Sequence, residues 1–131
     1  MGGTDFSIQK YMTHQPHTID AGQSIEAAED MMTRFQIHHL PVTKDGKLFG
    51  ILSDRDLKVT VGLSPQSLRL ADVCREQPYQ VPPNTPLSQV LDEMALNHFG
   101  SALVVKDGKL IGIFTTIDAC RTLSSLLKQM A

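Results

Sequence analysis

Two segments of this chain, residues 38–57 and 100–119, repeat one pattern. They align without a gap and share nine of twenty positions. Each contains an apolar run, an Asp-Gly pair and a second apolar run, followed by a hydroxyl residue with an aspartate three positions on. Self-similarity at a fixed long spacing indicates a chain built from repeated supersecondary units.

The repeat extends toward the N-terminus of each copy. Residues 8–12 align with residues 70–74, and residues 15–19 align with residues 77–81, at the same offset. A proline in each leading segment favours extended backbone just before it, so we predict that each copy opens with a short strand. The predicted boundaries are 8–62 and 70–124 for the two repeats, 63–69 for the linker and 125–131 for the end of the last helix.

An amphipathic helix is predicted next in each copy. Apolar residues recur at a spacing of three to four over residues 25–35 and over residues 87–94, which is typical of one apolar helix face. Thr85 is predicted as the N-cap of the second of these helices, with Pro86 at its first helical position.

A hairpin and a final helix complete each copy. Asp45-Gly46 and Asp107-Gly108 lie between short apolar runs, and Asp-Gly is a strong signal for a turn with positive φ at both positions. A short helix is predicted over residues 54–61, ending at Gly62. The corresponding helix after Thr115 is longer. Its predicted apolar stripe consists of Ile117, Cys120, Leu123, Leu127 and Met130.

Each repeat is thus a βαββα unit with a three-stranded sheet and two helices over it. Such a unit leaves apolar surface that a second unit can cover. We therefore predict an α+β fold in which two tandem repeats pack as a pseudo-two-fold pair.

Composition excludes several classes of protein. The net charge of −2 does not favour a nucleic-acid-binding surface overall, although it is compatible with a local basic pocket. No apolar run approaches the roughly 20 residues of a membrane span. The two cysteines, Cys74 and Cys120, form no Cys-x-x-Cys pair, which favours reduced thiols in a cytoplasmic protein. We expect neither nucleic-acid nor membrane partners.

Candidate chemistry lies where each final helix begins, at Ser53 with Asp56 and at Thr115 with Asp118. A hydroxyl with an acid three residues on is close to a capping box, which needs no ligand. Each motif also follows a Gly-Ile pair, and glycine permits close approach of another group, while a helix start attracts phosphate. The hydroxyl can donate to phosphate and the carboxylate can accept from both ribose hydroxyls. With an apolar cleft for a flat base, these groups indicate an adenosine nucleotide.

The repeat resembles a tandem pair of CBS domains, also called a Bateman module, from residue 8 to about residue 124. The most specific motifs are His-His-Leu-Pro-Val, Asp-Gly and Gly-Ile-Leu-Ser-x-x-Asp in the first copy, and Gly-Ile-Phe-Thr-x-x-Asp in the second. The resemblance implies two clefts between the repeats that bind AMP, ADP, ATP, NAD or S-adenosylmethionine. It assigns Asp56 and Asp118 to ribose.

The resemblance also implies further site residues. Phosphate contacts are expected from His38 and His39 in the first copy, and the second copy has Gly100 and Ser101 there, with no cation. The leading segments are expected to line the base pocket through their backbone. The other candidate binding residues are Gln15, His17, Thr18, Tyr79, Arg55, Ile113 and Thr116.

The histidines and Arg55 have alternative interpretations. His38 and His39 could be an ordinary surface or packing pair, and Arg55 could lie on a solvated helix face. A shared metal site at the two histidines is disfavoured, because neighbouring residues on a strand point to opposite faces. We expect no metal site. Because His38, His39 and Arg55 correspond to Gly100, Ser101 and Ile117, two clefts of unequal affinity or ligand preference are expected.

The resulting functional prediction is a regulatory module that binds adenosine nucleotides and signals by conformational or oligomeric change. A homodimer of such pairs and an unidentified effector protein are the expected partners. The alternative is a structural dimerisation module with no physiological ligand. An enzyme is not expected and no catalytic residue is assigned, since no nucleophile with its base stands at a recognisable spacing.

Overall fold

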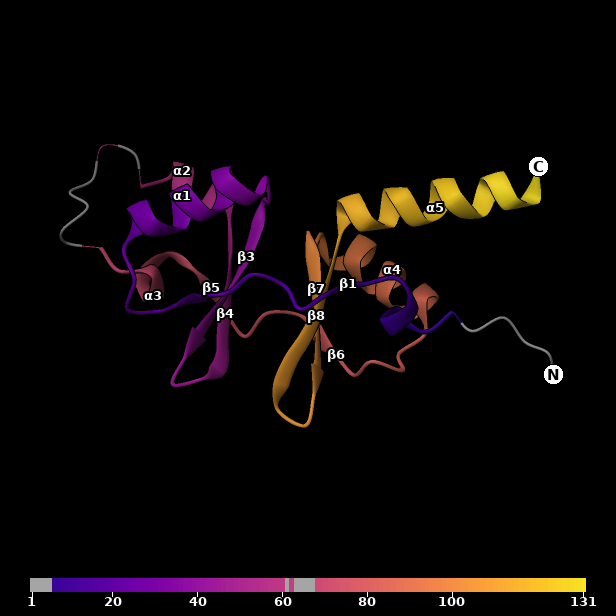
Figure 1. Cartoon of the computed structure of the whole chain (residues 1–131), viewed down its shortest axis with the longest axis horizontal. Helices are drawn as coiled ribbons and strands as arrows, with labels where there is room; N and C mark the ends of the chain where they lie inside the picture. Colours follow the sequence, from indigo (N-terminus) through magenta and orange to yellow (C-terminus); the bar gives the residue numbers. More distant parts are fainter. Residues whose placement is uncertain (1–5, 61, 63–67) are drawn as a thin grey trace. The chain divides into compact units, whose positions relative to one another are not determined.

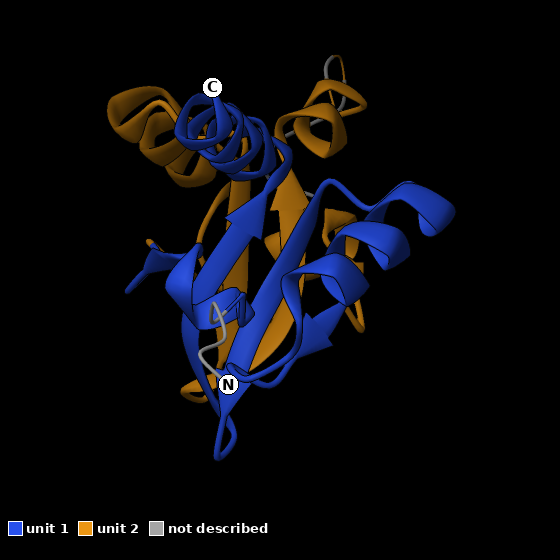
Figure 2. Ribbon diagram, turned by 90° about the vertical axis from the view of Figure 1, so that its right-hand side faces the viewer, with its two compact units in different colours: residues 1–16, 79–131 blue, residues 17–78 orange. Residues whose placement is uncertain are grey.

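The computed structural model describes residues 6–60, 62 and 68–131. The chain divides into two compact units, coloured separately in Figure 2. Unit 2 comprises residues 17–78, and unit 1 comprises residues 1–16 together with 79–131. Most of the predicted linker, residues 63–67, lies outside the described residues.

The units cut across the sequence repeats. The leading segment of the first repeat, up to Pro16, belongs to unit 1 with most of the second repeat. The leading segment of the second repeat, up to Pro78, belongs to unit 2 with most of the first repeat. The two repeats therefore exchange their leading segments.

Unit 2 is built on a four-stranded sheet in the order β2-β3-β4-β5. Figure 1 labels β3, β4 and β5 of this sheet. The central hairpin consists of β3 (His39–Lys44) and β4 (Lys47–Ser53), which are antiparallel. On one side β2 (Ile19–Asp20) runs parallel to β3, and on the other β5 (Arg75–Glu76) runs antiparallel to β4.

Unit 1 has the corresponding sheet, in the order β1-β8-β7-β6. Its hairpin consists of β7 (Ser101–Lys106) and β8 (Lys109–Thr115). The outer strands are β6 (Gln80–Val81), parallel to β7, and β1 (Thr13–His14), antiparallel to β8. The predicted α+β class with two tandem repeats is confirmed.

The two hairpin turns have the predicted backbone. The φ angles are 54° at Asp45 and 77° at Gly46, and 52° at Asp107 and 79° at Gly108. Positive φ at both central residues matches the right-handed twist of the flanking strands. Each hairpin also has a register irregularity at the equivalent place, after Val42 in β3 and after Val104 in β7.

The prediction of three-stranded sheets was wrong, because each sheet gains a fourth strand from the exchanged leading segment. Each leading segment also contains a short helical turn, η1 (Ile8–Lys10) in the first repeat and α3 (Leu70–Val73) in the second. Ile8 and Leu70 are both completely buried, so each turn inserts one apolar side chain into the core of the unit that it joins.

Two helices of unit 2 lie side by side. Helix α1 (Ile25–Phe35) begins after Ser24, whose Oγ accepts a hydrogen bond from the Ala27 N–H at 3.0 Å. Helix α2 (Asp54–Lys58) ends earlier than the predicted residue 61. The Thr60 hydroxyl donates to the Leu57 carbonyl at 2.6 Å, and such a local bond competes with continued helix. Residue 61 lies outside the described residues.

In unit 1, helix α4 (Leu87–Asn97) does not have the predicted cap. The Thr85 hydroxyl donates to the Pro82 carbonyl at 2.8 Å instead of receiving a helix N–H. Pro86 is the N-cap residue, with extended backbone and no side-chain cap, so it lies one position before the helix rather than inside it.

Helix α5 (Thr116–Met130) begins at the predicted residue and has no buried side chain. All five residues of its predicted apolar stripe are exposed. Among the described helices, none combines the length and apolar composition that crossing a membrane requires.

Candidate functional site

In unit 2 the motif forms a complete capping box at the start of α2. Ser53 Oγ accepts a hydrogen bond from the Asp56 N–H at 3.1 Å, and Asp56 Oδ2 accepts from the Ser53 N–H at 2.9 Å. Both residues are partly exposed. The box accounts for one oxygen of Asp56, and no hydrogen bond to its Oδ1 is seen among the described residues.

Unit 1 repeats this arrangement at the start of α5. Asp118 Oδ2 accepts from the Thr115 N–H at 2.9 Å, and Thr115 Oγ1 accepts from the Asp118 N–H at 3.3 Å. Here the second carboxylate oxygen also has a partner, because the Thr13 hydroxyl donates to Asp118 Oδ1 at 3.3 Å. In unit 2, Asp56 therefore completes the capping box and still has one carboxylate oxygen without a hydrogen bond from a described residue. In unit 1, Thr13 donates to the corresponding oxygen of Asp118.

Strand register brings the predicted phosphate-contacting residues beside each motif. His39 pairs with Ser53, and Ser101 pairs with Thr115. The carbonyl of the residue before His39, and that of the residue before Ser101, each accept a hydrogen bond from the N–H of the first residue of the following helix, α2 or α5. The distances are 3.0 Å from Asp54 N to His38 O and 3.2 Å from Thr116 N to Gly100 O.

The two adjacent histidines differ in environment. His38 is exposed, and its Nδ1 donates to Asp54 Oδ2 at 2.9 Å. This hydrogen bond lowers the pKa of Asp54 below its usual value. His39 is partly buried, and burial lowers its pKa, an effect that Asp54 partly opposes. His39 is therefore neutral at neutral pH and can donate a hydrogen bond, but it brings no full charge to a phosphate.

Of the three other predicted site residues near the motifs, two are exposed and one is buried. Arg55 and Thr116 are exposed on the first turn of α2 and α5 respectively. Ile113 is buried on β8, directly opposite Thr13, so its side chain contributes to packing.

The leading segments divide their predicted residues between the units. Gln15, near the end of the first segment of unit 1, has a positive φ of 50° and donates its N–H to the Ile111 carbonyl at 3.2 Å. His17 and Thr18 are exposed in unit 2, where the His17 ring stacks on Phe35 with centroids 3.8 Å apart. The predicted segment from Gln15 to Asp20 therefore does not belong to one unit.

Tyr79 opens the second segment of unit 1. Its carbonyl accepts from the Leu103 N–H at 2.9 Å, and its ring stacks on Phe99 with centroids 5.0 Å apart. Burial raises the pKa of the Tyr79 phenol. Its buried hydroxyl has no hydrogen-bond partner among the described residues.

Comparison with known families decides the identity of the fold and its repeats. The model of the CBS domain family matches residues 8–61 and residues 70–125. The chain belongs to the CBS domain family. The two matches cover most of the chain, and each includes one Ser/Thr-x-x-Asp motif.

Individual CBS proteins resemble this chain over most of its length. Hypoxic response protein 1 of Mycobacterium tuberculosis is 29% identical over 105 residues, covering 77% of this chain and 73% of that protein. The structure of a Vibrio cholerae protein described as an acetoin utilization protein matches with a TM-score of 0.87 and 27% identity, over 97% of this chain and 96% of that one. The structure of CBSX2 in complex with AMP matches with a TM-score of 0.80 and 25% identity, over 92% and 98%.

Sequence reasoning missed two residues next to the CBS motifs, Thr13 and Arg75. They occupy equivalent positions on the exchanged strands, since Thr13 pairs with Ile113 and Arg75 pairs with Ile51. The constant offset between the repeats relates the two positions and could have revealed them. Nothing in either repeat alone indicates that these residues lie beside a motif of the other repeat.

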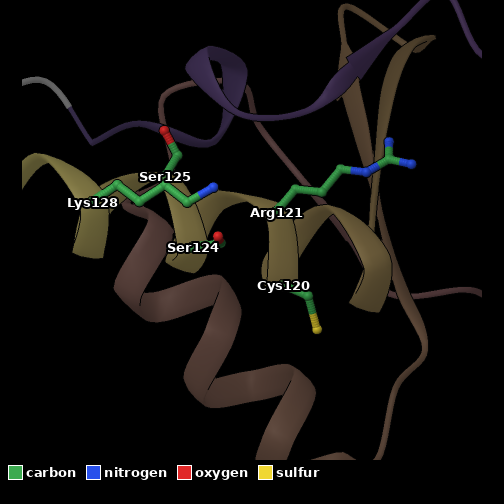
Figure 3. A pocket seen from close by; sticks show the side chains of 5 residues that line it. All are labelled: Cys120, Arg121, Ser124, Ser125 and Lys128. Atoms are coloured by element: carbon green, nitrogen blue, oxygen red, sulfur yellow. The ribbon is translucent and has the colours of Figure 1, made fainter.

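The surface hollows described in unit 1 lie elsewhere, along α5. One hollow, of about 450 Å³, is lined by Cys120, Arg121, Ser124, Ser125 and Lys128. Figure 3 labels these side chains on α5. A second, of about 570 Å³, includes Phe6 and Tyr11 beside the same helix. Neither contains a predicted site residue. In the described part of the CBS repeats, no three His, Cys, Asp or Glu side chains are grouped so that they could hold a metal ion.

Proposed function

We propose that this chain is a regulatory module that binds adenosine nucleotides at its two Ser/Thr-x-x-Asp sites. AMP, ADP, ATP, NAD and S-adenosylmethionine are the candidate ligands. The observation that carries the proposal is the hydroxyl–carboxylate pair, built twice at equivalent positions. It stands in a chain similar to CBSX2, which has been solved with AMP.

Each chemical group has a defined role in this proposal. The Asp56 and Asp118 carboxylates accept hydrogen bonds from the ribose hydroxyls, while the Ser53 hydroxyl donates to phosphate. The Thr115 hydroxyl donates to Asp118 Oδ2 at 3.1 Å in this structure, so it must rotate before it can donate to phosphate. The capping boxes hold these side chains in place before the ligand arrives, which reduces the entropy lost on binding. The module is not an enzyme in this proposal. Its output passes to an effector protein, or to a second copy, in the cytoplasm.

Isothermal titration calorimetry of nucleotide-stripped protein tests the proposal. We expect heat of binding with at least one of AMP, ADP, ATP, NAD and S-adenosylmethionine at ligand concentrations up to about 1 mM. A Kd of about 1 mM corresponds to a binding free energy of about −4 kcal/mol. Absence of heat with all five would exclude the proposed ligand class. Protein purified without stripping offers a second readout near 260 nm, because the chain has no Trp and only two Tyr.

Replacing Asp118 with alanine is expected to weaken binding at the unit 1 site about tenfold or more, because a charged acceptor for the ribose hydroxyls is lost. The same change removes one half of a capping box and costs about 0.5–2 kcal/mol of stability. Calorimetry measures the first effect and thermal unfolding the second. Asp92→Ala, on the exposed surface of α4, is the control and leaves both unchanged. Undiminished binding by Asp118→Ala would remove Asp118 from the ribose contact.

The exposed stripe of α5 favours the second candidate function, a dimerisation module. Ile117, Leu123 and Leu127 are 51%, 59% and 55% exposed, at a spacing that places them on one face of the helix. A second copy of this chain is the proposed partner, with matching stripes in contact.

Leu123→Glu combined with Leu127→Glu is expected to convert a dimer into a monomer, because four charges, two from each copy, would be buried between the helices. Sedimentation velocity measures the change in mass. Both positions are more than half exposed, so the melting temperature of the monomer should fall only slightly. Ser125→Glu, on the other side of the helix, is the control and keeps the dimer. A wild-type protein that sediments as a monomer at high concentration would contradict the proposed dimer.

A further inference from the structure

The exchanged strands place different side chains next to the two CBS motifs. Arg75 on β5 pairs with Ile51, and Thr13 on β1 pairs with Ile113. Since β4 and β8 are equivalent strands, Arg75 and Thr13 have the same register relative to their motifs. Side chains at equivalent register leave the sheet on the same face.

The direction of this face is known from unit 1. There the Thr13 hydroxyl contacts Asp118 Oδ1 at 3.3 Å. At the equivalent position of unit 2, the side chain of Arg75 therefore leaves its strand on the face of Asp56. Arg75 is exposed, and no ion pair within 4.0 Å involves it among the described residues. Asp56 Oδ1 likewise has no hydrogen bond from a described residue.

Other charges around the two motifs reinforce the difference. Unit 2 has Arg55 on the first turn of α2, where unit 1 has Ile117. His38 is already paired with Asp54 at 2.9 Å, and His39 is kept neutral by burial. Among the described residues, the cations beside the unit 2 motif that have no ion pair are therefore Arg75, Arg55 and Lys58, and Lys58 corresponds to Cys120 in unit 1.

The neighbouring charges on the exchanged strands do not cancel this difference. Glu76 follows Arg75, and His14 follows Thr13. Successive side chains on a strand point to opposite faces, so Glu76 and His14 point away from the motif-facing side. Unit 1 has no cation at the positions that correspond to Arg55, Arg75, His38 and His39.

We propose that Arg75 binds the 5′-phosphate of an adenosine nucleotide and makes the unit 2 site selective for phosphorylated ligands, while Thr13 leaves unit 1 to phosphate-free adenosine compounds. This inference rests on the proposed function, since it divides one ligand class between the two sites. A guanidinium binds phosphate through two parallel N–H donors. The threonine hydroxyl has no charge, and it already donates to the carboxylate that would hold ribose.

AMP and adenosine, which differ only by the phosphate, are the probes for calorimetry on the full chain. We expect Arg75→Thr, which introduces the residue of unit 1, to weaken AMP binding about tenfold or more and adenosine binding by less than twofold. AMP binding to the wild type should weaken as salt increases, whereas adenosine binding should not. Thr13→Arg should strengthen AMP binding at the unit 1 site.

Two matched variants identify the source of the effect. Lys47→Thr removes the same charge at the opposite end of β4 and should leave AMP binding unchanged. Asp56→Asn should abolish the phosphate-sensitive site, and Asp118→Asn should spare it. Thermal unfolding of each variant checks that it is folded.

The results separate this inference from the proposed function. If the wild type binds both AMP and adenosine but Arg75→Thr weakens neither, or both equally, the role of Arg75 is wrong and nucleotide binding stands. If the wild type binds neither probe nor the other candidate nucleotides, the proposed function is wrong and this inference fails with it.

Discussion

Phe114→Ala is expected to lower the free energy of unfolding by about 3–5 kcal/mol, the range for truncating a buried aromatic side chain. Phe114 is completely buried on β8 and is the largest side chain with no solvent exposure among those described. It belongs to the core of unit 1 with Val90, Met94 and Val104. These neighbours come from helix α4 and strand β7, so the cavity that alanine would leave cannot close by moving one loop.

Urea unfolding followed by circular dichroism measures this loss. Phe35→Ala is the control, since Phe35 is 38% exposed and its ring stacks on that of His17. We expect the control to cost about 1 kcal/mol, the value of one aromatic pair. Equal losses for Phe114 and Phe35 would contradict the position of Phe114 in the core.

Gly50→Ala is expected to destabilise the protein by about 3 kcal/mol, and the equivalent Gly112→Ala by about 1 kcal/mol, within the range for overpacking. A Cβ at Gly50 would lie 2.6 Å from the backbone oxygen of Arg75. A Cβ at Gly112 would overlap Met12 Sδ. The flexible methionine side chain can move aside, but the carbonyl of Arg75 can move only if β5 separates from β4.

Thermal unfolding of the two alanine variants compares these positions directly. Lys109→Ala, at the exposed start of β8, is the control and should change stability by less than about 0.5 kcal/mol. If Gly112→Ala proves as damaging as Gly50→Ala, the side chain of Met12 is fixed and the argument from its flexibility is wrong. Loss of nucleotide binding by folded Gly50→Ala would further connect β5 with the unit 2 site.

Features set by neighbouring residues could be predicted from the sequence. The Asp-Gly turns need positive φ, and both central residues have it. The two capping boxes depend on residues three positions apart, and both form as the motif indicates. The short strands predicted in the leading segments form as β2 and β6. The proline argument itself was wrong, because the residues before the two prolines, Gln15 and Gln77, have positive φ angles of 50° and 55° instead of extended backbone.

Features set by distant pairing could not be predicted in this way. Strands β1 and β5 have two residues each and no alternating pattern, and β1 pairs with a strand from the other repeat. Thr13 and Arg75 were missed for the same reason. The prediction of Thr85 as an N-cap was wrong for a local reason, because its hydroxyl donates to the Pro82 carbonyl in the preceding turn.

The exchange of leading segments determines the order in which the units can be completed during synthesis. Unit 2 is one continuous stretch, residues 17–78, and all of it is available before most of unit 1 has been translated. Strand β1 leaves the ribosome before any of unit 2, yet its partner β8 follows only after unit 2 is finished. Strand β1 must therefore wait, with its pairing edge unoccupied, while the whole of unit 2 is made. A released chain that ends at residue 78 would contain a complete unit 2 and an unpaired β1.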